Sequence, residues 1–292
     1  MTMPQPTLAD ELDGTLHVVP ATRFHRLTEL EFGMPGLVAV ESVGPFVQLA
    51  KVGPFITIHD SFLAPGLGIG HHPHRGNERL FYILRGEIRH DDSLNGISGT
   101  MGEGDLARLT EGERGMLHKE WNGRDDVTTH AFILVYTPDV VPPIPKASFD
   151  ALRAADMPRV TEAPGVETLE LIGGRSAFRA NTSALTSFLD SSFAEGASAE
   201  VTLPSQSGLL VYPLEGRVGL EAPPDPEAQL LGSSDVHPEG PDGIAIAWSD
   251  ERDRVVRLSA RGGAARAIRL GFARRDESDL LVHRPWQRRE GR

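Results

Sequence analysis

Short runs rich in β-branched and aromatic residues recur along the chain, and turn residues end each of them. In the first half such runs lie at residues 55–59, 80–84 and 129–136, with Pro65-Gly66 among the turns. Short apolar runs at this spacing, without long stretches of helical periodicity, are typical of a sandwich or a barrel rather than of alternating strands and helices. The pattern therefore predicts an all-β protein with few short helices.

The second half of the chain repeats the pattern of the first. Residues 80–88 read as an apolar strand, a turn that ends in glycine and a second strand, and residues 209–218 read in the same way. Further on, residues 104–109 are echoed by residues 243–248. Such patterns also arise by chance in β proteins, but two echoes in the same order favour internal duplication. The sequence thus predicts two tandem barrels of the same kind.

A proline-rich stretch separates the two halves. Its prolines cannot donate to a sheet ladder, so they predict a linker. We expect five segments in order: a flexible arm at 1–15, a first barrel at 16–137, a linker with a short helix at 138–160, a second barrel at 161–283 and a basic tail at 284–292. The helix is placed over residues 148–155, with Ser148 as its N-cap and Pro158 ending it.

Composition excludes several classes of partner. Among the 292 residues, 39% are hydrophobic and 24% are charged, as in an ordinary soluble protein. The net charge of −12 repels phosphate backbones, so we expect no direct nucleic-acid partner. No run approaches the roughly 18 apolar residues of a membrane-spanning helix, and residues 1–16 lack a signal-peptide core. We therefore expect a cytoplasmic protein with no membrane partner.

Candidate chemistry lies in the histidines. The chain has no cysteine, so any metal must be held by histidine and carboxylate side chains. Residues i and i+2 of a strand point the same way, so His72 and His74 share a face while His71 points away. His118 and Glu120 form a second pair of the same kind. Surface histidines are the alternative, but that reading suits a lone histidine better than two such pairs.

Together the two pairs supply three imidazoles and one carboxylate. That set suits one divalent first-row metal ion with two positions left for water, substrate or O₂. The sequence therefore predicts a metal site on the inner face of the first barrel. The second half has no comparable cluster, because His237 and His283 stand alone, so we expect its barrel to bind no metal.

Two stretches resemble known motifs. Residues 66–78 resemble the first motif of the cupins, and residues 104–122 resemble their second, with Thr110 where proline is usual. More narrowly, the chain is similar to the pirin family of two-cupin proteins over about residues 54–137. The matching stretches are His72-Pro73-His74-Arg75, residues 90–96, residues 104–106 and His118-Lys119-Glu120. The resemblance implies a bicupin fold, with two tandem jelly-roll β-barrels.

The resemblance also bears on the acidic ligand. General cupins use the glutamate four residues after the second histidine, here Glu78, whereas pirins use the one two residues after the third, here Glu120. Alternation along the strand would turn both inward. The pirin-like stretches favour Glu120, which leaves Glu78 as a group that orients an imidazole or as an alternative ligand.

Two functions follow from the resemblance. Bacterial pirin-like proteins include quercetin 2,3-dioxygenases, which open the flavonol ring with O₂ and release carbon monoxide. This implies an oxidoreductase with a small aromatic substrate, a metal held by the four residues above, and Glu120 taking the proton of the flavonol 3-hydroxyl. Iron(II) is favoured, with manganese, nickel, copper and zinc as alternatives. The alternative is a regulatory protein without turnover: the resemblance to eukaryotic pirins implies an iron-dependent protein that binds a transcription factor, and bacterial pirins can bind a metabolic enzyme.

Overall fold

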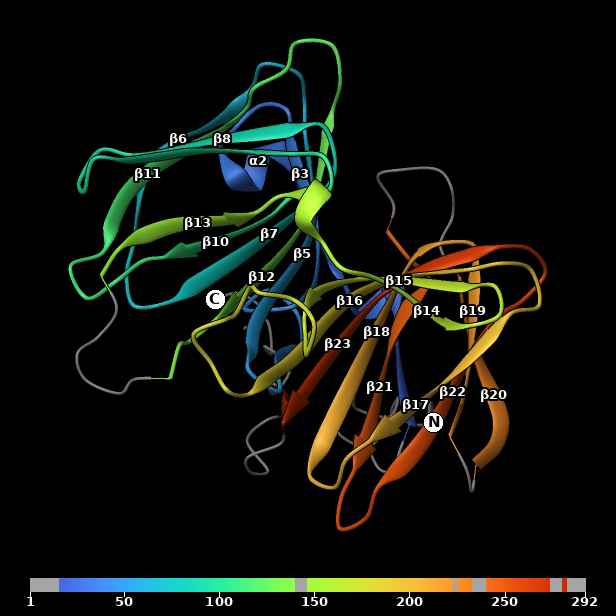
Figure 1. Ribbon diagram of the computed structural model, residues 1–292. Helices are drawn as coiled ribbons and strands as arrows, with labels where there is room; N and C mark the ends of the chain where they lie inside the picture. Colours follow the sequence, from blue (N-terminus) through green and yellow to red (C-terminus); the bar gives the residue numbers. More distant parts are fainter. Residues whose placement is uncertain (1–15, 140–145, 223–224, 233–239, 274–279, 283–292) are drawn as a thin grey trace, which may run out of the picture.

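The computed structural model describes residues 16–139, 146–222, 225–232, 240–273 and 280–282. The expected arm at 1–15 and basic tail at 284–292 lie outside these residues. Within them the chain is built almost entirely of strands (Figure 1), which confirms the all-β prediction. The helical elements are η1 (Ala21–Arg23), α2 (Glu29–Phe32) and η2 (Ala154–Asp156). None of the helices in the described part is long and apolar enough to cross a membrane.

The first half of the chain forms two facing sheets. The large sheet runs in the order β13 (Ser148–Leu152), β10 (Leu106–Thr110), β7 (Glu78–Arg85), β12 (Thr129–Tyr136), β5 (Phe55–Leu63), β3 (Leu37–Val43) and β2 (His25–Leu27), with β4 (Leu49–Val52) and β24 (Leu280–Val282) attached beside β5. The small sheet runs β6 (Gly68–His74), β11 (Met116–Asn122), β8 (Glu87–Asp92) and β9 (Ile97–Gly102).

The second half repeats this arrangement, except that β4 and β24 have no counterparts among its described residues. Its large sheet runs β1 (Leu16–Pro20), β21 (Gly243–Ser249), β18 (Ser207–Glu215), β23 (Ala265–Ala273), β16 (Leu185–Phe193), β15 (Val166–Ile172) and β14 (Arg159–Ala163). Its small sheet runs β17 (Ser198–Leu203), β22 (Arg254–Ala260), β19 (Arg217–Ala222) and β20 (Asp225–Gly232). The echoes seen in the sequence are equivalent elements, β7 with β18 and β10 with β21, so the predicted duplication is confirmed.

Three elements differ from what the sequence suggested: two strands pair in the other half, and one expected helix is a strand. Strand β1 comes from the start of the first half but pairs with β21 in the second, and β24 comes from the end of the chain but pairs with β4 in the first. The helix predicted over residues 148–155 is wrong, because Ser148–Leu152 is a strand paired with β10. Its Phe149 ring stacks on His90 and packs against Gly99, and these contacts outweigh the helix signal. Only η2 is helical there.

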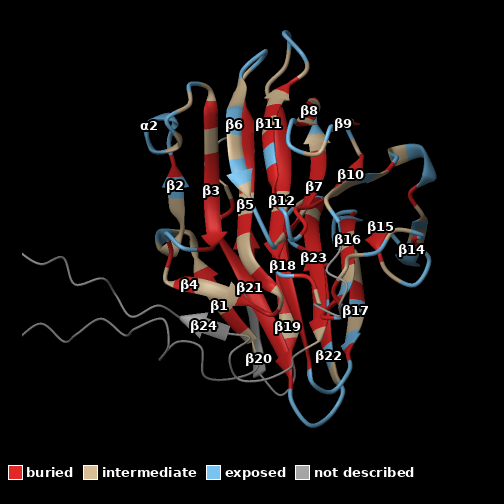
Figure 2. Cartoon of the chain, turned by 90° about the vertical axis from the view of Figure 1, so that its left-hand side faces the viewer, coloured by how far each residue is buried: buried red, intermediate tan, exposed pale blue. Residues whose placement is uncertain are grey.

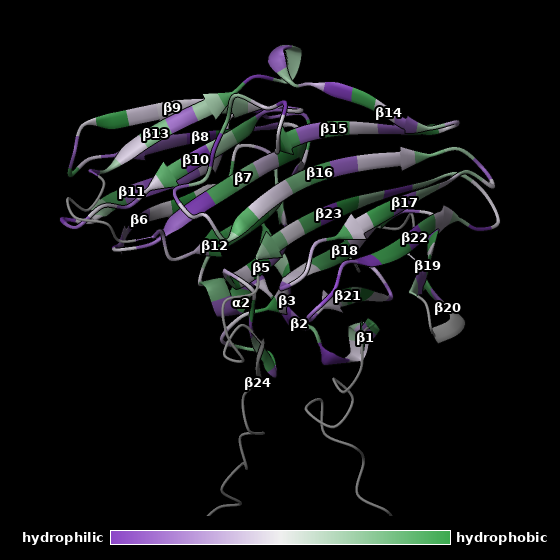
Figure 3. Cartoon of the chain, turned by 60° about the horizontal axis from the view of Figure 1, so that its bottom comes forward, coloured by the Kyte–Doolittle hydropathy of each residue, from purple (hydrophilic) through white to green (hydrophobic). Residues whose placement is uncertain are grey.

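Three apolar clusters hold the layers together. The largest lies between the two large sheets, which pack face to face (Figure 2); it draws Leu80 and Phe132 from one and Leu210 and Ile268 from the other. A second fills the space between the sheets of the second half. The third, between the sheets of the first half, is smaller. Apolar and polar residues alternate along many of these strands (Figure 3), as expected where the two faces of a strand meet different surroundings.

Two tyrosine–aspartate hydrogen bonds cross the interface between the halves in opposite directions. The hydroxyl of Tyr82 donates to Oδ2 of Asp190 at 2.6 Å, and that of Tyr212 donates to Oδ2 of Asp60 at 3.1 Å. The same offset along the chain separates Tyr82 from Tyr212 and Asp60 from Asp190, so the two bonds are related by the duplication. Arg266 also donates to Asp190, at 2.9 Å and 2.6 Å. Burial, next to the Asp190 charge, raises the pKa of Tyr82 far above its usual value.

We expect Asp190→Ala to lower the free energy of unfolding by about 3–5 kcal/mol, because it leaves the partly buried Arg266 guanidinium with only the exposed Glu215, at 3.4 Å. Tyr82→Phe should cost only about 1 kcal/mol, since it removes one hydrogen bond. Urea unfolding followed by tryptophan fluorescence measures both. Asp126→Ala is the control, because the Arg124–Asp126 pair is exposed and should leave the unfolding midpoint unchanged. Equal effects of Asp190→Ala and Asp126→Ala would contradict this account of the interface.

Candidate metal centre

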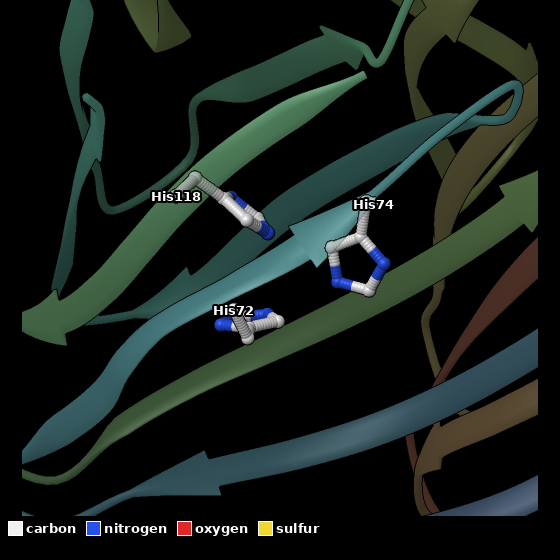
Figure 4. Close-up of side chains that lie close together, drawn as sticks. All are labelled: His72, His74 and His118. Carbon is white, nitrogen blue, oxygen red and sulfur yellow. The ribbon is translucent and has the colours of Figure 1, made fainter. Parts of the chain in front are cut away.

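Three imidazoles converge between the two sheets of the first half. His72 and His74 extend from β6 and His118 extends from β11, and their rings point toward one another (Figure 4). One nitrogen of each lies within 4.8 Å of one nitrogen of the others. The ring centroids of His72 and His118 are 4.4 Å apart, and those of His74 and His118 are 4.9 Å apart. The sequence prediction that these three side chains share one face is therefore met.

Strand pairing brings the two parts of the cluster together. Strands β6 and β11 are antiparallel, with His118 opposite His72 and Met116 opposite His74. Glu120 lies two residues after His118 on β11, so strand alternation turns both side chains inward, and the pairing with β6 shifts register between them. Asp92, at the end of β8, accepts the backbone N–H of Leu117 at 3.0 Å. This bond fixes the start of β11 and so the position of His118.

Glu120 and His90 form a second group around His118. Oε1 of Glu120 lies 3.4 Å from Nδ1 of His118 and 4.0 Å from Nδ1 of His90. The Nδ1 atoms of His118 and His90 are 3.2 Å apart. Ligand atoms of these three residues also lie within 4.8 Å of one another. His118 is thus shared between a set of three imidazoles and a set that contains the carboxylate.

The cluster is held in its uncharged form. Burial, together with the neighbouring His72 and His74, lowers the pKa of His118 to about 2. Burial also lowers the pKa of His74 to about 3 and that of His90 to about 4. Burial raises the pKa of Glu120 to about 7, against the opposing charge of Arg79. Neutral imidazole is the form that binds metal, so no proton need leave these rings first.

Unpaired polar atoms show that the residues fit a metal ion. Nε2 of His118, Nε2 of His90 and Oε1 of Glu120 are buried without a hydrogen-bond partner. Each such atom costs about 1–3 kcal/mol unless something binds it. Nδ1 of His72 donates to the carbonyl of Gly70 at 2.8 Å, which leaves its Nε2 with a free lone pair. These imidazole and carboxylate atoms are the donors that divalent first-row metals take.

His74 differs from His72, because one of its ring nitrogens already accepts a hydrogen bond from Arg79. Arg79 carries only donors, so its Nη2–H donates to Nδ1 of His74, at 2.7 Å. The proton of neutral His74 then sits on Nε2. Glu111, which is fully buried, accepts from Nε of Arg79 at 3.0 Å and fixes the guanidinium. His74 can join a metal only by giving up its bond to Arg79 or by losing the Nε2 proton.

Glu78 does not face the cluster, and the prediction from alternation is wrong on this point. It accepts from Thr110 at 2.7 Å, from Tyr136 at 3.1 Å and from the side chain of Asn181 at 2.6 Å, on the face of β7 that meets the second half. Strand β6 ends at His74 and β7 begins at Glu78, and Gly76 between them has φ of 85°. The turn breaks the alternation, so residues four apart no longer point the same way.

A mostly apolar pocket of about 360 Å³ opens beside the imidazoles. Phe81, Ile133 and Ala131 form its floor on the large sheet, and Phe32 and Met34 reach it from α2 and the residue beyond its end. His72, His74, Glu120 and Arg79 supply its polar end. The volume is at the lower end of the range of about 300–1,000 Å³ that is typical of small-molecule sites.

Sequence reasoning found three imidazoles and the carboxylate but missed His90, Arg79 and Glu111. His90 lies opposite Glu120 in the pairing of β8 with β11. Alternation of polar and apolar residues after Glu87 could have indicated that His90 faces inward. The sequence could not show that Glu120 lies opposite it. Arg79 and Glu111 are separated by 32 residues and meet only through the pairing of β7 with β10.

Paired jelly-roll sheets with a histidine cluster between the sheets of one half define a cupin-type protein. Residues 28–134 match the family described as Pirin. Pirin-1 from Arabidopsis thaliana is 27% identical over 207 residues, which are 70% of each chain. Pirin-like protein 2 from the same plant is 27% identical over 70% of this chain and 63% of its own length. This chain therefore contains a pirin domain, and the resemblance seen in its sequence is confirmed.

Solved structures share the fold. Quercetin 2,3-dioxygenase from Acinetobacter baumannii has a TM-score of 0.66 at 20% identity, over 89% of this chain and 86% of that one. The bacterial pirin YhhW from Escherichia coli, solved in complex with nickel(II), has a TM-score of 0.61 at 14% identity, over 89% of this chain and 100% of that one. These likenesses confirm the bicupin architecture.

We expect His118→Ala and His72→Ala to lower the affinity for nickel(II) by about 100-fold or more, because each removes one imidazole of the candidate ligand set. His74→Ala should cost less, since Arg79 already occupies one of its nitrogens. Calorimetric titration of the metal-free protein measures the three affinities. His71→Ala is the matched control, because that neighbouring histidine is exposed. Unchanged affinity in His118→Ala would exclude the cluster as the metal site.

Proposed function

We propose that this chain is a metal-dependent oxygenase that acts on a flavonol-type aromatic substrate, with His72, His74, His118 and Glu120 as the metal ligands. The observation that carries the proposal is the apolar pocket that opens directly beside the imidazole cluster. A structural metal site needs no such cavity, whereas a catalytic site must admit a substrate next to its open positions. The name of the Acinetobacter baumannii structure supports the same reaction class.

The chain's own residues account for binding and for one proton transfer. Phe81, Ile133 and Phe32 offer apolar surface to a flat ring system and exclude water from it. Oε1 of Glu120 has no partner and Glu120 lines the pocket, so it can accept the proton of a substrate hydroxyl that enters the cluster. A divalent ion held by the cluster would supply Lewis acidity and, where it is iron, redox chemistry with O₂.

Protein loaded with iron(II), manganese(II) or nickel(II) should bleach the flavonol absorbance band of quercetin in air. His72→Ala should abolish the reaction, because it removes a ligand, whereas His71→Ala should retain it. Glu120→Gln should lower kcat by about 100-fold, because the amide cannot take the proton. Metal content measured on each variant separates loss of the ion from loss of the base. A Glu120→Gln variant with full metal content and full turnover would rule out the proton role.

The same assay distinguishes the regulatory alternative. Stoichiometric metal without turnover of quercetin or related flavonols would overturn the oxygenase proposal. It would favour a protein that binds a transcription factor or a metabolic enzyme. Leu30 and Phe46, which are exposed by 90% and 63%, would then be the first surface residues to test for a partner.

A further inference from the structure

The pocket has a second polar end, away from the metal-ligand candidates. His59 on β5 lines the pocket, and its Nε2 lies 2.8 Å from Oε2 of Glu41 on β3. The two residues are directly opposite in the pairing of these strands. Neither belongs to the proposed ligand set.

Glu41 occupies a position built around its carboxylate. The residue is 1% exposed, and its Oε1 accepts the backbone N–H of Phe46 at 2.7 Å. A side chain at Gly44 would place its Cβ 2.3 Å from the carboxyl carbon of Glu41, so only glycine leaves the carboxylate its space. The loop at residues 44–46 therefore wraps around the acid and holds it against His59.

This arrangement leaves a hydrogen-bond acceptor open to the pocket. The Glu41 carboxylate receives the Phe46 N–H on one oxygen, so the other accepts the Nε2–H of His59. In the tautomer that this bond selects, the lone pair of the imidazole lies on Nδ1. No hydrogen bond from the described residues reaches that atom, and the side chain is 19% exposed. Glu41 therefore fixes the orientation of His59, whose Nδ1 can accept a hydrogen bond from a molecule bound in the pocket.

Apolar surface separates this acceptor from the imidazole cluster. His59 is paired with Ile133, and Ile133 is paired with Phe81, so the three form one row across β5, β12 and β7. Two strand spacings separate the ends of that row by about 10 Å. Arg79, which contacts His74, lies on β7 two residues before Phe81. A bicyclic aromatic ring system could span this floor.

We propose that His59 is a specificity-determining residue, and that the pocket takes a flat aromatic molecule with a hydroxyl on the end away from the imidazoles. The hydroxyl donates to Nδ1 of His59, and Glu41 orients the ring by accepting the hydrogen bond of its Nε2–H. The inference deepens the proposed function and rests on it for the choice of flavonols as substrates. The pairing of a hydroxyl with His59 rests on the pocket alone.

The first test uses naphthalene and 2-naphthol as probes on nickel-loaded protein under argon, where no turnover occurs. The wild type should bind 2-naphthol about tenfold more tightly than naphthalene, as one hydrogen bond allows. His59→Phe should abolish this preference and leave naphthalene affinity unchanged. His59→Gln should restore part of it, because its amide can donate to Glu41 and accept from the hydroxyl. His71→Phe is the matched control and should keep the full preference.

The second test compares 3-hydroxyflavone with galangin and kaempferol, which carry added hydroxyls on one or both ends. At least one of them should bind the wild type about tenfold more tightly than 3-hydroxyflavone and lose that advantage in His59→Phe. Thermal unfolding of each variant shows whether it remains folded.

The outcomes separate the two proposals. A naphthol preference that depends on His59, without binding of any flavonol, supports the acceptor and overturns the flavonol substrate. Flavonol turnover with equal probe preferences in the wild type and His59→Phe overturns the acceptor and leaves the oxygenase. If His59→Phe and His59→Gln both unfold, Glu41→Gln takes their place: it should weaken the naphthol preference, and an unchanged preference overturns the proposal.

Discussion

Face-to-face packing of the two large sheets is the constraint on which the rest of the structure depends. Each large sheet is covered on both sides, by its counterpart on one and by a small sheet on the other. Its central strands therefore read as continuous apolar runs, as in residues 80–84 and 209–211. Polar groups in such a layer need partners, and the two tyrosine–aspartate bonds provide them. Because the duplication gives each half one tyrosine and one aspartate at this interface, each aspartate accepts a hydrogen bond from the tyrosine of the other half.

Among the residues that the structure describes, the same architecture carries a cluster of imidazoles in the first half and none in the second. In the second half, small and branched apolar residues such as Ala199, Val218 and Val256 fill the space between the sheets. In the first half the apolar cluster takes up only part of the corresponding space, and imidazoles, Glu120 and the pocket take the remainder. Burial there both neutralises the histidines and leaves nitrogen lone pairs without partners. The cost of those unpaired atoms is what a bound ion would offset.

Much of the fold and the central part of the site could be predicted from the sequence, because both follow from local periodicity. The inward pairs His72 with His74 and His118 with Glu120 depend only on alternation within one strand. The prediction failed where a turn intervened, as at Gly76 before Glu78. The sequence made no prediction for residues that meet only through strand pairing, such as His59 and Glu41. Which strands become neighbours depends on the fold of the whole chain, so it cannot be predicted from a local stretch of sequence.

The exchange of end strands has a consequence for how the protein is made. Strand β1 is synthesised well before its partner β21, because the rest of the first half and most of the second lie between them in the sequence. Strand β24 is later still, and it pairs with β4 near the beginning. The other strands of the first half can pair without the second half, but each large sheet is complete only when a strand from the distant part of the chain has joined it. Such long-range pairings form slowly, so we expect the two large sheets to be completed late in folding.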